Sequence, residues 1–190
     1  MNIQFTFSSL LLLFFLPISG YALEVAEVNV SEQVLLANTN TPLKLNGAGV
    51  RSKFFFKIYV GALYLPQKTT NAEKAINMEG GKRILMHFLY KKVEKEKLVE
   101  GWVDGFKNNH SGEQFEALKT KLEAFNKLFD TVKRGDRIEL DYLPEIGTQV
   151  SINDQIKGSI FGKVFYSALL KVWLGEDPAD SDLKEAMLGK

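Results

Sequence analysis

Apolar residues are densest between Lys53 and Leu65 (KFFFKIYVGALYL), where aromatic and β-branched side chains dominate. Such a run predicts a central, buried strand. Its even-numbered residues would share one face: Phe54, Phe56, Ile58, Val60, Ala62 and Tyr64. Arg83–Tyr90 predicts a second strand, with Ile84, Met86, Phe88 and Tyr90 on one face. Shorter β-like stretches lie at Val25–Val30 and Val34–Ala37, and the turn-rich run Asn38–Pro42 follows them.

A different spacing, with apolar residues three or four positions apart, predicts three longer helices. The first carries Leu98, Trp102 and Phe106 and ends at Asn108-Asn109, and the second begins at Ser111-Gly112. The apolar residues of this second helix are Phe115, Leu118, Leu122, Phe125 and Phe129. The third, Phe161–Leu174, ends at Gly175 and should turn these residues inward: Phe161, Val164, Phe165, Ala168, Leu169 and Val172. Shorter helices are predicted at Asn71–Met78 and after Ser181, the expected N-cap.

Strands return between the second and third long helices. Arg137–Leu143 alternates apolar and polar residues, and Asn153-Asp154 joins Gln149–Ile152 to Gln155–Ile160 as a hairpin. Strands and helices do not alternate regularly, so we predict an α+β fold in which helices pack on an antiparallel sheet.

The N-terminus has the layout of a cleaved signal peptide over residues 1–22. Leu10–Ile18 is continuously apolar, and Gly20-Tyr21-Ala22 places small residues before a cut after Ala22. The run is shorter than the roughly 20 residues that span a membrane, so we expect no permanent membrane span. Met1–Ser9 has no Lys or Arg, and an apolar N-terminal strand or lipophilic tail is the alternative. We expect one domain, residues 23–190, periplasmic or secreted.

Composition excludes several kinds of chemistry. The chain has no cysteine, so disulfides and thiolate sites are impossible, and its net charge of +1 does not suggest a nucleic-acid partner. His87 and His110 are far apart and lack further ligands at metal-site spacing, so we expect no metal and no cofactor. Gly47-Ala48-Gly49 is interpreted as a turn rather than a phosphate loop. No oligomerisation surface stands out, and we expect a monomer.

Polar residues next to aromatic sequence are the candidate functional groups: Arg51, Lys57, Tyr59, Tyr64 and Tyr90. A guanidinium in an aromatic pocket offers a planar fork matched to a carboxylate, and a phenol can add another donor. From the residues alone, however, we favour an Arg51 that faces water at a strand edge, because Arg is mostly exposed in folded proteins.

Two segments resemble the chalcone isomerase-like family: Leu45–Leu65 (LNGAGVRSKFFFKIYVGALYL) and Gly162–Gly189, which contains WLGEDP. The chain is identified as a bacterial, exported member. The resemblance implies an open-faced β-sandwich, in which a layer of helices covers a large antiparallel sheet and a ligand cleft lies between them.

The resemblance also implies roles for two residues. Arg51 matches the family arginine that holds an anionic oxygen, and Tyr59 stands where the isomerase has Thr and the fatty-acid-binding relatives have Tyr. Glu94 and Gly101 stand where the isomerase has Tyr and Asn. We therefore expect a non-catalytic binder of a small amphipathic carboxylate such as a fatty acid, with Phe55 among the residues lining the tail. Alternatives are a chalcone–flavanone isomerase (an intramolecular lyase) that uses Arg51, or an interaction module with a filled cleft.

A continuous strand through this segment conflicts with a site that Arg51 and Tyr59 share. On one continuous strand, Arg51 and Tyr59 would be about 26 Å apart and could not hold the same carboxylate. The family resemblance therefore requires the chain to bend or reverse between Ser52 and Phe56.

Overall fold

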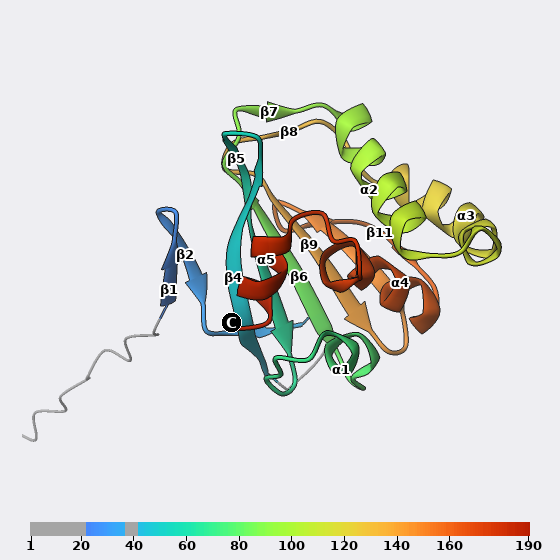
Figure 1. Cartoon of the computed structure of the whole chain (residues 1–190), viewed down its shortest axis with the longest axis horizontal. Coiled ribbons are helices and arrows are strands. Elements are labelled where there is room, and N and C mark those ends of the chain that lie inside the picture. Colours follow the sequence, from blue (N-terminus) through green and yellow to red (C-terminus); the bar gives the residue numbers. More distant parts are fainter. Residues whose placement is uncertain (1–21, 37–41) are drawn as a thin grey trace, which may run out of the picture.

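A seven-stranded antiparallel sheet forms the centre of the computed structural model, which describes residues 22–36 and 42–190 (Figure 1). Its strand order is β11-β10-β9-β6-β5-β4-β3. The bounds are β3 (Gln33–Leu35), β4 (Pro42–Lys53), β5 (Phe56–Leu65), β6 (Lys82–Phe88), β9 (Arg137–Leu143), β10 (Gly147–Ile152) and β11 (Gln155–Ile160). Two short pairs accompany the sheet: β1 (Ala22–Val25) with β2 (Val28–Ser31), and β7 (Lys92–Val93) with β8 (Val132–Lys133).

The helices pack against one face of this sheet. They are α1 (Ala72–Asn77), α2 (Lys95–Asn109), α3 (Gly112–Asn126), α4 (Lys163–Leu174) and α5 (Ser181–Met187). Alternate residues of the strands, such as Leu63, Ile84 and Leu140, share one core with Trp102 of α2 and Leu169 of α4. Strands and helices thus form two layers, and the predicted α+β, open-faced sandwich is confirmed. No helix in the described part of the chain is long and apolar enough to span a membrane.

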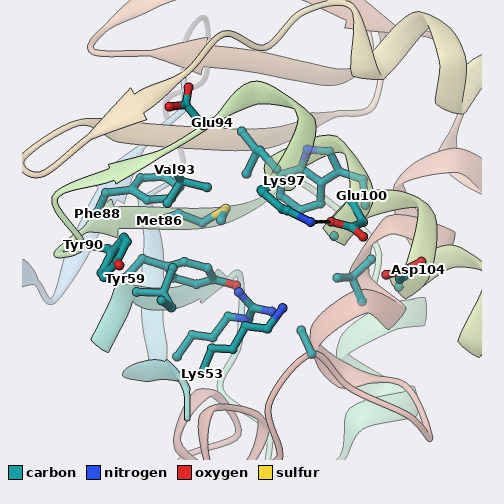
Figure 2. Close-up of a pocket in the computed structure, with 18 of the residues that line it drawn as sticks. Lys53, Tyr59, Met86, Phe88, Tyr90, Val93, Glu94, Lys97, Glu100 and Asp104 are labelled. Atoms are coloured by element: carbon teal, nitrogen blue, oxygen red, sulfur yellow. Dashed lines mark hydrogen bonds and ion pairs between the residues drawn. The ribbon is translucent and has the colours of Figure 1, made fainter. Parts of the chain in front are cut away.

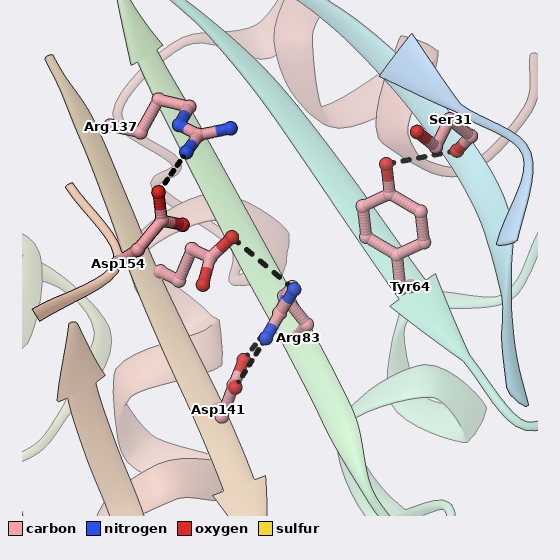
Figure 3. A network of polar contacts seen from close by, with 7 residues as sticks. Ser31, Tyr64, Arg83, Arg137, Asp141 and Asp154 are labelled. Atoms are coloured by element: carbon pink, nitrogen blue, oxygen red, sulfur yellow. Dashed lines mark hydrogen bonds and ion pairs between the residues drawn. The ribbon is translucent and has the colours of Figure 1, made fainter. Parts of the chain in front are cut away.

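The opposite face of the sheet is covered in part by the β1–β2 pair. Val60, Ala62 and Tyr64 of β5 form a second apolar cluster with Val30 of β2. The Tyr64 hydroxyl donates to the Ser31 carbonyl at 2.9 Å (Figure 3). Both faces of β5 are therefore buried, which explains its nearly continuous apolar sequence.

Beyond β5, the outer face becomes ionic. Arg83 of β6 donates from two nitrogens to the Asp141 carboxylate of β9, each at 2.6 Å, and from a third to Glu139 at 3.2 Å (Figure 3). These are neighbouring strands, with Arg83 directly opposite Asp141. The fork satisfies a charge that would otherwise be costly to bury.

The prediction of one strand over Lys53–Leu65 was wrong at its beginning. The chain reverses between β4 and β5, and Phe54, which has a φ of +55°, lies in the turn. Phe54, Phe55 and Phe56 are exposed and share no buried face. A run of aromatic residues has the same sequence pattern in a turn as in a strand, so periodicity alone could not locate the reversal.

Gly47-Ala48-Gly49 is also not a turn, because it lies within β4. A Cβ on Gly47 would be 2.1 Å from the carbonyl oxygen of Ala186, and one on Gly49 would be 2.6 Å from the Cβ of Ala186. The glycines therefore allow α5 to approach the strand closely. Asn46 fastens the same helix, since its amide donates to the Met187 carbonyl at 2.7 Å.

The starts of helices α4 and α5 differ slightly from the predicted ones. Phe161 and Val164 are exposed rather than inward, since α4 begins only at Lys163, after Gly162 at a φ of +106°. The N-cap of α5 is Asp180, not Ser181, and its side chain accepts from the Leu183 amide. The hairpin at Asn153-Asp154 and the start of α3 at Ser111-Gly112 are confirmed, and Ser111 is the N-cap of that helix. The predicted leader covers residues 1–22, of which residues 1–21 lie outside the described residues, as do residues 38–41 of the predicted turn.

Candidate functional site

A cavity of about 500 Å³ lies between the helical layer and strands β4 to β6 (Figure 2). Helix α2 forms one wall, and the segment Asp177–Ala179 after α4 contributes to another. Its lining residues are Arg51, Lys53, Ile58, Tyr59, Met86, Phe88, Tyr90, Lys92, Val93, Glu94, Lys97, Leu98, Glu100, Gly101, Trp102, Asp104, Gly105, Asn108, Val172, Asp177, Pro178 and Ala179. The volume is in the range of small-molecule sites, roughly 300–1,000 Å³.

Arg51 and Tyr59 are direct neighbours in this cavity. The reversal between β4 and β5 pairs Arg51 with Tyr59 across the two strands, and the register shifts immediately afterwards. The Arg51 guanidinium carbon lies 5.7 Å from the centre of the Tyr59 ring. Both residues point to the helical side of the sheet, as directly opposed side chains of an antiparallel pair do. The reversal that the family resemblance required is thus present.

The Arg51 side chain is half-buried and incompletely paired. Its Nε is buried without a hydrogen-bond partner in the described part of the chain. Among the ion pairs of that part, none involves Arg51. A buried donor without a partner is costly, and an anionic oxygen in the cavity would remove that cost.

Tyr59 is held in place from the helical layer. Its hydroxyl oxygen accepts a hydrogen bond from Trp173 Nε1 of α4 at 2.9 Å. Burial raises the pKa of Tyr59, outweighing the opposing effects of the nearby Arg51 charge and the Trp173 hydrogen bond, while Asp180 raises it further. The phenol is therefore neutral at pH 7. No described residue accepts its proton, so the O–H is available to an acceptor in the cavity.

The inner walls are mostly apolar. Ile58, Met86, Phe88, Leu98 and Val172 line the cavity from both layers. The indole of Trp102 also lines it, and its Nε1 is buried without a hydrogen-bond partner among the described residues. The cavity therefore combines apolar walls with a few donors, which suits a ligand that has an apolar body and an acceptor group.

The charged rim is largely neutralised by its own pairs. Lys97 contacts Glu100 at 2.6 Å, as the dashed line in Figure 2 shows, and Lys92 contacts Glu94 at 2.7 Å. The hydrogen bond from Lys92, followed by one from Thr131, lowers the pKa of Glu94. Arg51 is set apart from these groups because no carboxylate of the described residues pairs with it.

The other three candidate residues, Lys57, Tyr64 and Tyr90, lie in three different places. Tyr90 lines the cavity, whereas Tyr64 lies on the opposite face of the sheet and Lys57 is exposed beside a separate surface hollow. Phe55 was expected to contact the ligand tail, and this was wrong, because its side chain is fully exposed in the β4–β5 turn. Glu94 and Gly101, identified through the resemblance, both line the cavity.

Trp102 and Trp173 were missed as site residues. Trp102 was assigned only to the apolar face of its helix, and Trp173 was not among the residues expected to face inward. A core Trp and a cavity Trp have the same sequence pattern. The described residues also hold no group of three His, Asp or Glu side chains that could bind a metal.

Comparisons with known proteins agree with this fold. A family model described as chalcone isomerase-like matches residues 22–189. Among solved structures, a fatty-acid binding protein of Arabidopsis thaliana is similar, with a TM-score of 0.61 and 17% identity over 83% of this chain and 96% of that one. No protein with a curated description matches the sequence.

Proposed function

This chain belongs to the chalcone isomerase-like family, and from that premise we propose that it is a non-catalytic binding protein for a small amphipathic carboxylate such as a fatty acid. The observation that carries the proposal is the pairing of Arg51 with Tyr59 across β4 and β5, inside an apolar cavity. That the similar Arabidopsis structure is named a fatty-acid binding protein supports the same interpretation.

The head group would be held by two donors of different kinds. Arg51 supplies a positive charge and an unpartnered Nε, and Tyr59 supplies a neutral O–H whose proton has no acceptor in the described part of the chain. A carboxylate can accept from both at once. Trp173 fixes the phenol before a ligand arrives, which reduces the ordering that binding requires.

The tail would lie along the apolar walls. Met86 and Phe88 line the cavity from the sheet, and Leu98 and Val172 line it from the helices. Burial of an alkyl chain there contributes about 0.8 kcal/mol per CH₂ group. Affinity should therefore rise with chain length until the cavity is filled.

Native mass spectrometry and calorimetry with dodecanoate, kept below its micelle concentration, test the proposal. Arg51→Ala should weaken binding at least tenfold, because a charge-assisted hydrogen bond contributes about 1.5–3 kcal/mol. Arg134→Ala is the matched control, since Arg134 is exposed and lies away from this cavity. Methyl dodecanoate, which has no charge, should bind the wild type and Arg51→Ala alike. Equal dodecanoate affinity in wild type and Arg51→Ala would rule the proposal out.

Two lining positions favour binding over the alternative isomerase activity. Gly101 offers no polar side chain, and the Glu94 carboxylate is already held by Lys92 and Thr131. The isomerase would use Arg51 to stabilise a phenolate and a developing enolate by electrostatics. Incubation with a chalcone should leave its absorbance unchanged, whereas turnover abolished by Arg51→Ala would establish the isomerase instead.

We also infer that the protein is exported, to a bacterial periplasm or the medium, and acts as a monomer. Support for export is the apolar leader with small residues before Ala22. Ala22 is the first residue of β1 and pairs with Ser31, so a cut after it would shorten that strand by one residue. The mass of the protein recovered from the expressing cell checks this, and a retained leader would contradict it.

A further inference from the structure

The turn between β4 and β5 presents three consecutive phenylalanines to solvent. Phe54, Phe55 and Phe56, called the aromatic tip below, are 86%, 100% and 56% exposed. The turn lies at one end of the sheet, beside β7 and β8 (Figure 1). Single exposed apolar residues are ordinary, but a contiguous cluster marks a surface that contacts something else.

The geometry of the turn does not explain these residue types. Phe54 has a φ of +55°, a conformation that Gly or Asn adopts more readily than an aromatic residue. Phe55 contributes nothing to the core, because its side chain is fully exposed. Turns usually carry Gly, Asn, Asp or Ser, so three phenylalanines oppose both local conformation and solubility.

The base of the tip is held firmly. The Phe56 ring packs edge-on against Tyr90, with ring centres 5.5 Å apart. The backbone amides of Leu89 and Tyr90 both donate to the Ile58 carbonyl, at 2.9 and 3.1 Å. Phe54 and Phe55 are thus displayed on a supported hairpin end.

Basic side chains surround the tip. Lys53 and Lys57 flank it in the sequence, and both are exposed. A surface hollow next to it is lined by Phe55 and Phe56 together with Lys57, Lys91 and Arg134, with Glu27 as the one acidic residue in that lining. Apolar residues at the apex with cations behind them complement an anionic lipid surface, in which acyl chains lie beneath charged head groups.

We propose that the aromatic tip docks the protein onto anionic lipid bilayers. Phe54 and Phe55 enter the boundary between head groups and acyl chains, and Lys57, Lys91 and Arg134 contact lipid phosphates. This docking does not depend on what the internal cavity binds. Lys53 and Tyr90 line that cavity close to the tip, so a docked molecule would hold one side of the cavity near the bilayer.

A tryptophan placed at the tip tests this in the full chain. Phe55→Trp should show a blue shift and be quenched by brominated acyl chains in phosphatidylglycerol vesicles. Ile156→Trp is the matched control, because Ile156 is also exposed but lies on edge strand β11, which three strands separate from β5. The native Trp102 and Trp173 are buried, and the signal of the unmodified chain is subtracted. The quenching reports only on the position that carries the introduced tryptophan. A molecule that adhered to the vesicle through residues 1–21 would therefore not give the same signal.

Charge dependence completes the test. The variant that combines Phe55→Trp with Lys57→Gln and Lys91→Gln should need at least about fivefold more phosphatidylglycerol than Phe55→Trp alone to reach the same quenching. Phe55→Trp itself should likewise need at least about fivefold more lipid when the vesicles are neutral phosphatidylcholine. Quenching of Phe55→Trp no greater than that of Ile156→Trp would overturn the proposal, as would equal insertion into neutral vesicles. A blue shift that grows with protein concentration without lipid would assign the tip to a second copy of the chain instead.

Discussion

At the scale of single residues, the Tyr59 hydroxyl connects the two layers of the fold. It accepts from Trp173 Nε1 at 2.9 Å and lies beside Arg51. The hydroxyl oxygen accepts from Trp173 and so holds the two layers together. The hydroxyl proton has no acceptor among the described residues and can be donated to a ligand.

Tyr59→Phe should therefore lower stability as well as ligand affinity. The substitution leaves the buried Trp173 N–H without an acceptor, which costs about 1–3 kcal/mol in free energy of unfolding. Urea unfolding measures this cost. Tyr90→Phe is the control, because no hydrogen bond of the Tyr90 hydroxyl is found in the described part of the chain, and its stability should change by less than about 0.5 kcal/mol. Equal losses in the two variants would contradict the assigned role of Trp173.

Lys82 is a second unusual residue, distant from the cavity. Its side chain is fully buried, its Nζ has no hydrogen-bond partner among the described residues, and it lies over the rings of Tyr142 and Tyr166 at 5.2 and 5.9 Å. Its pKa is lowered from 10.5 to about 8, chiefly by burial and then by the charge of the nearby Lys163, while Glu79 opposes the shift.

The lowered pKa makes stability depend on pH. Between about pH 8 and pH 10.5 the folded protein has lost the Lys82 proton while the unfolded chain retains it. The contribution of Lys82 to the free energy of unfolding should therefore increase as the pH rises from about 8 to about 10.5. Lys82→Met should remove this rise and stabilise the protein at pH 7 by about 1–3 kcal/mol, because a charge no longer has to be buried.

Urea unfolding at several pH values between 7 and 10.5 measures the effect. The exposed Lys127→Met serves as control and should keep the pH dependence of the wild type. If Lys82→Met and the wild type differ by the same amount at every pH, the lowered pKa is disproved.

At the scale of elements, the contact between β4 and α5 determines where the end of the chain lies. Asn46 bonds to the Met187 carbonyl, and Gly47 and Gly49 leave room for Ala186. Asp180 joins the same two elements, since its carboxylate accepts from the amides of Ser52 and Leu183. The helix is thus fastened at both of its ends to the strand that carries Arg51.

Gly47→Ala should displace this helix. The new Cβ would be 2.1 Å from the Ala186 carbonyl oxygen, which is backbone and cannot rotate away. We expect a loss of about 1–3 kcal/mol, measured by chemical unfolding. Gly101→Ala is the matched control, because its Cβ would meet nothing within 4 Å and Ala favours a helix by up to about 1 kcal/mol. A Gly47→Ala variant as stable as Gly101→Ala would show that α5 is not tightly docked.

At the scale of the whole molecule, the cavity lies between the two layers and exists only when they are packed together. A ligand that binds this cavity stabilises the folded state alone. At a free ligand concentration of 100 times Kd, the free energy of unfolding should increase by about 2.7 kcal/mol. Urea unfolding with and without dodecanoate measures this, and at the same concentration the increase for Arg51→Ala, which binds at least tenfold more weakly, should be about 1.4 kcal/mol or less. An equal increase in both proteins would place the ligand elsewhere.

Much of this architecture could be predicted because it is local. The apolar spacing of Leu98, Trp102 and Phe106 anticipated α2, and the alternation in Arg137–Leu143 anticipated β9. The turn at Phe54 could not be predicted in this way, because aromatic residues are strong strand formers and here occupy an exposed reversal. The candidate site depended on the family resemblance, since sequence physics alone favoured an exposed Arg51.

By itself, the sequence determined most of the longer elements, the α+β class and the absence of cysteine chemistry, and its family resemblance made Arg51 and Tyr59 candidate site residues. Only the tertiary structure decided that these two residues face each other, that Trp173 holds the phenol, and that three phenylalanines lie exposed. The physical reason is that periodicity reports which side of one element is apolar. It does not report which distant element covers that side, and register and packing across the two layers decide this.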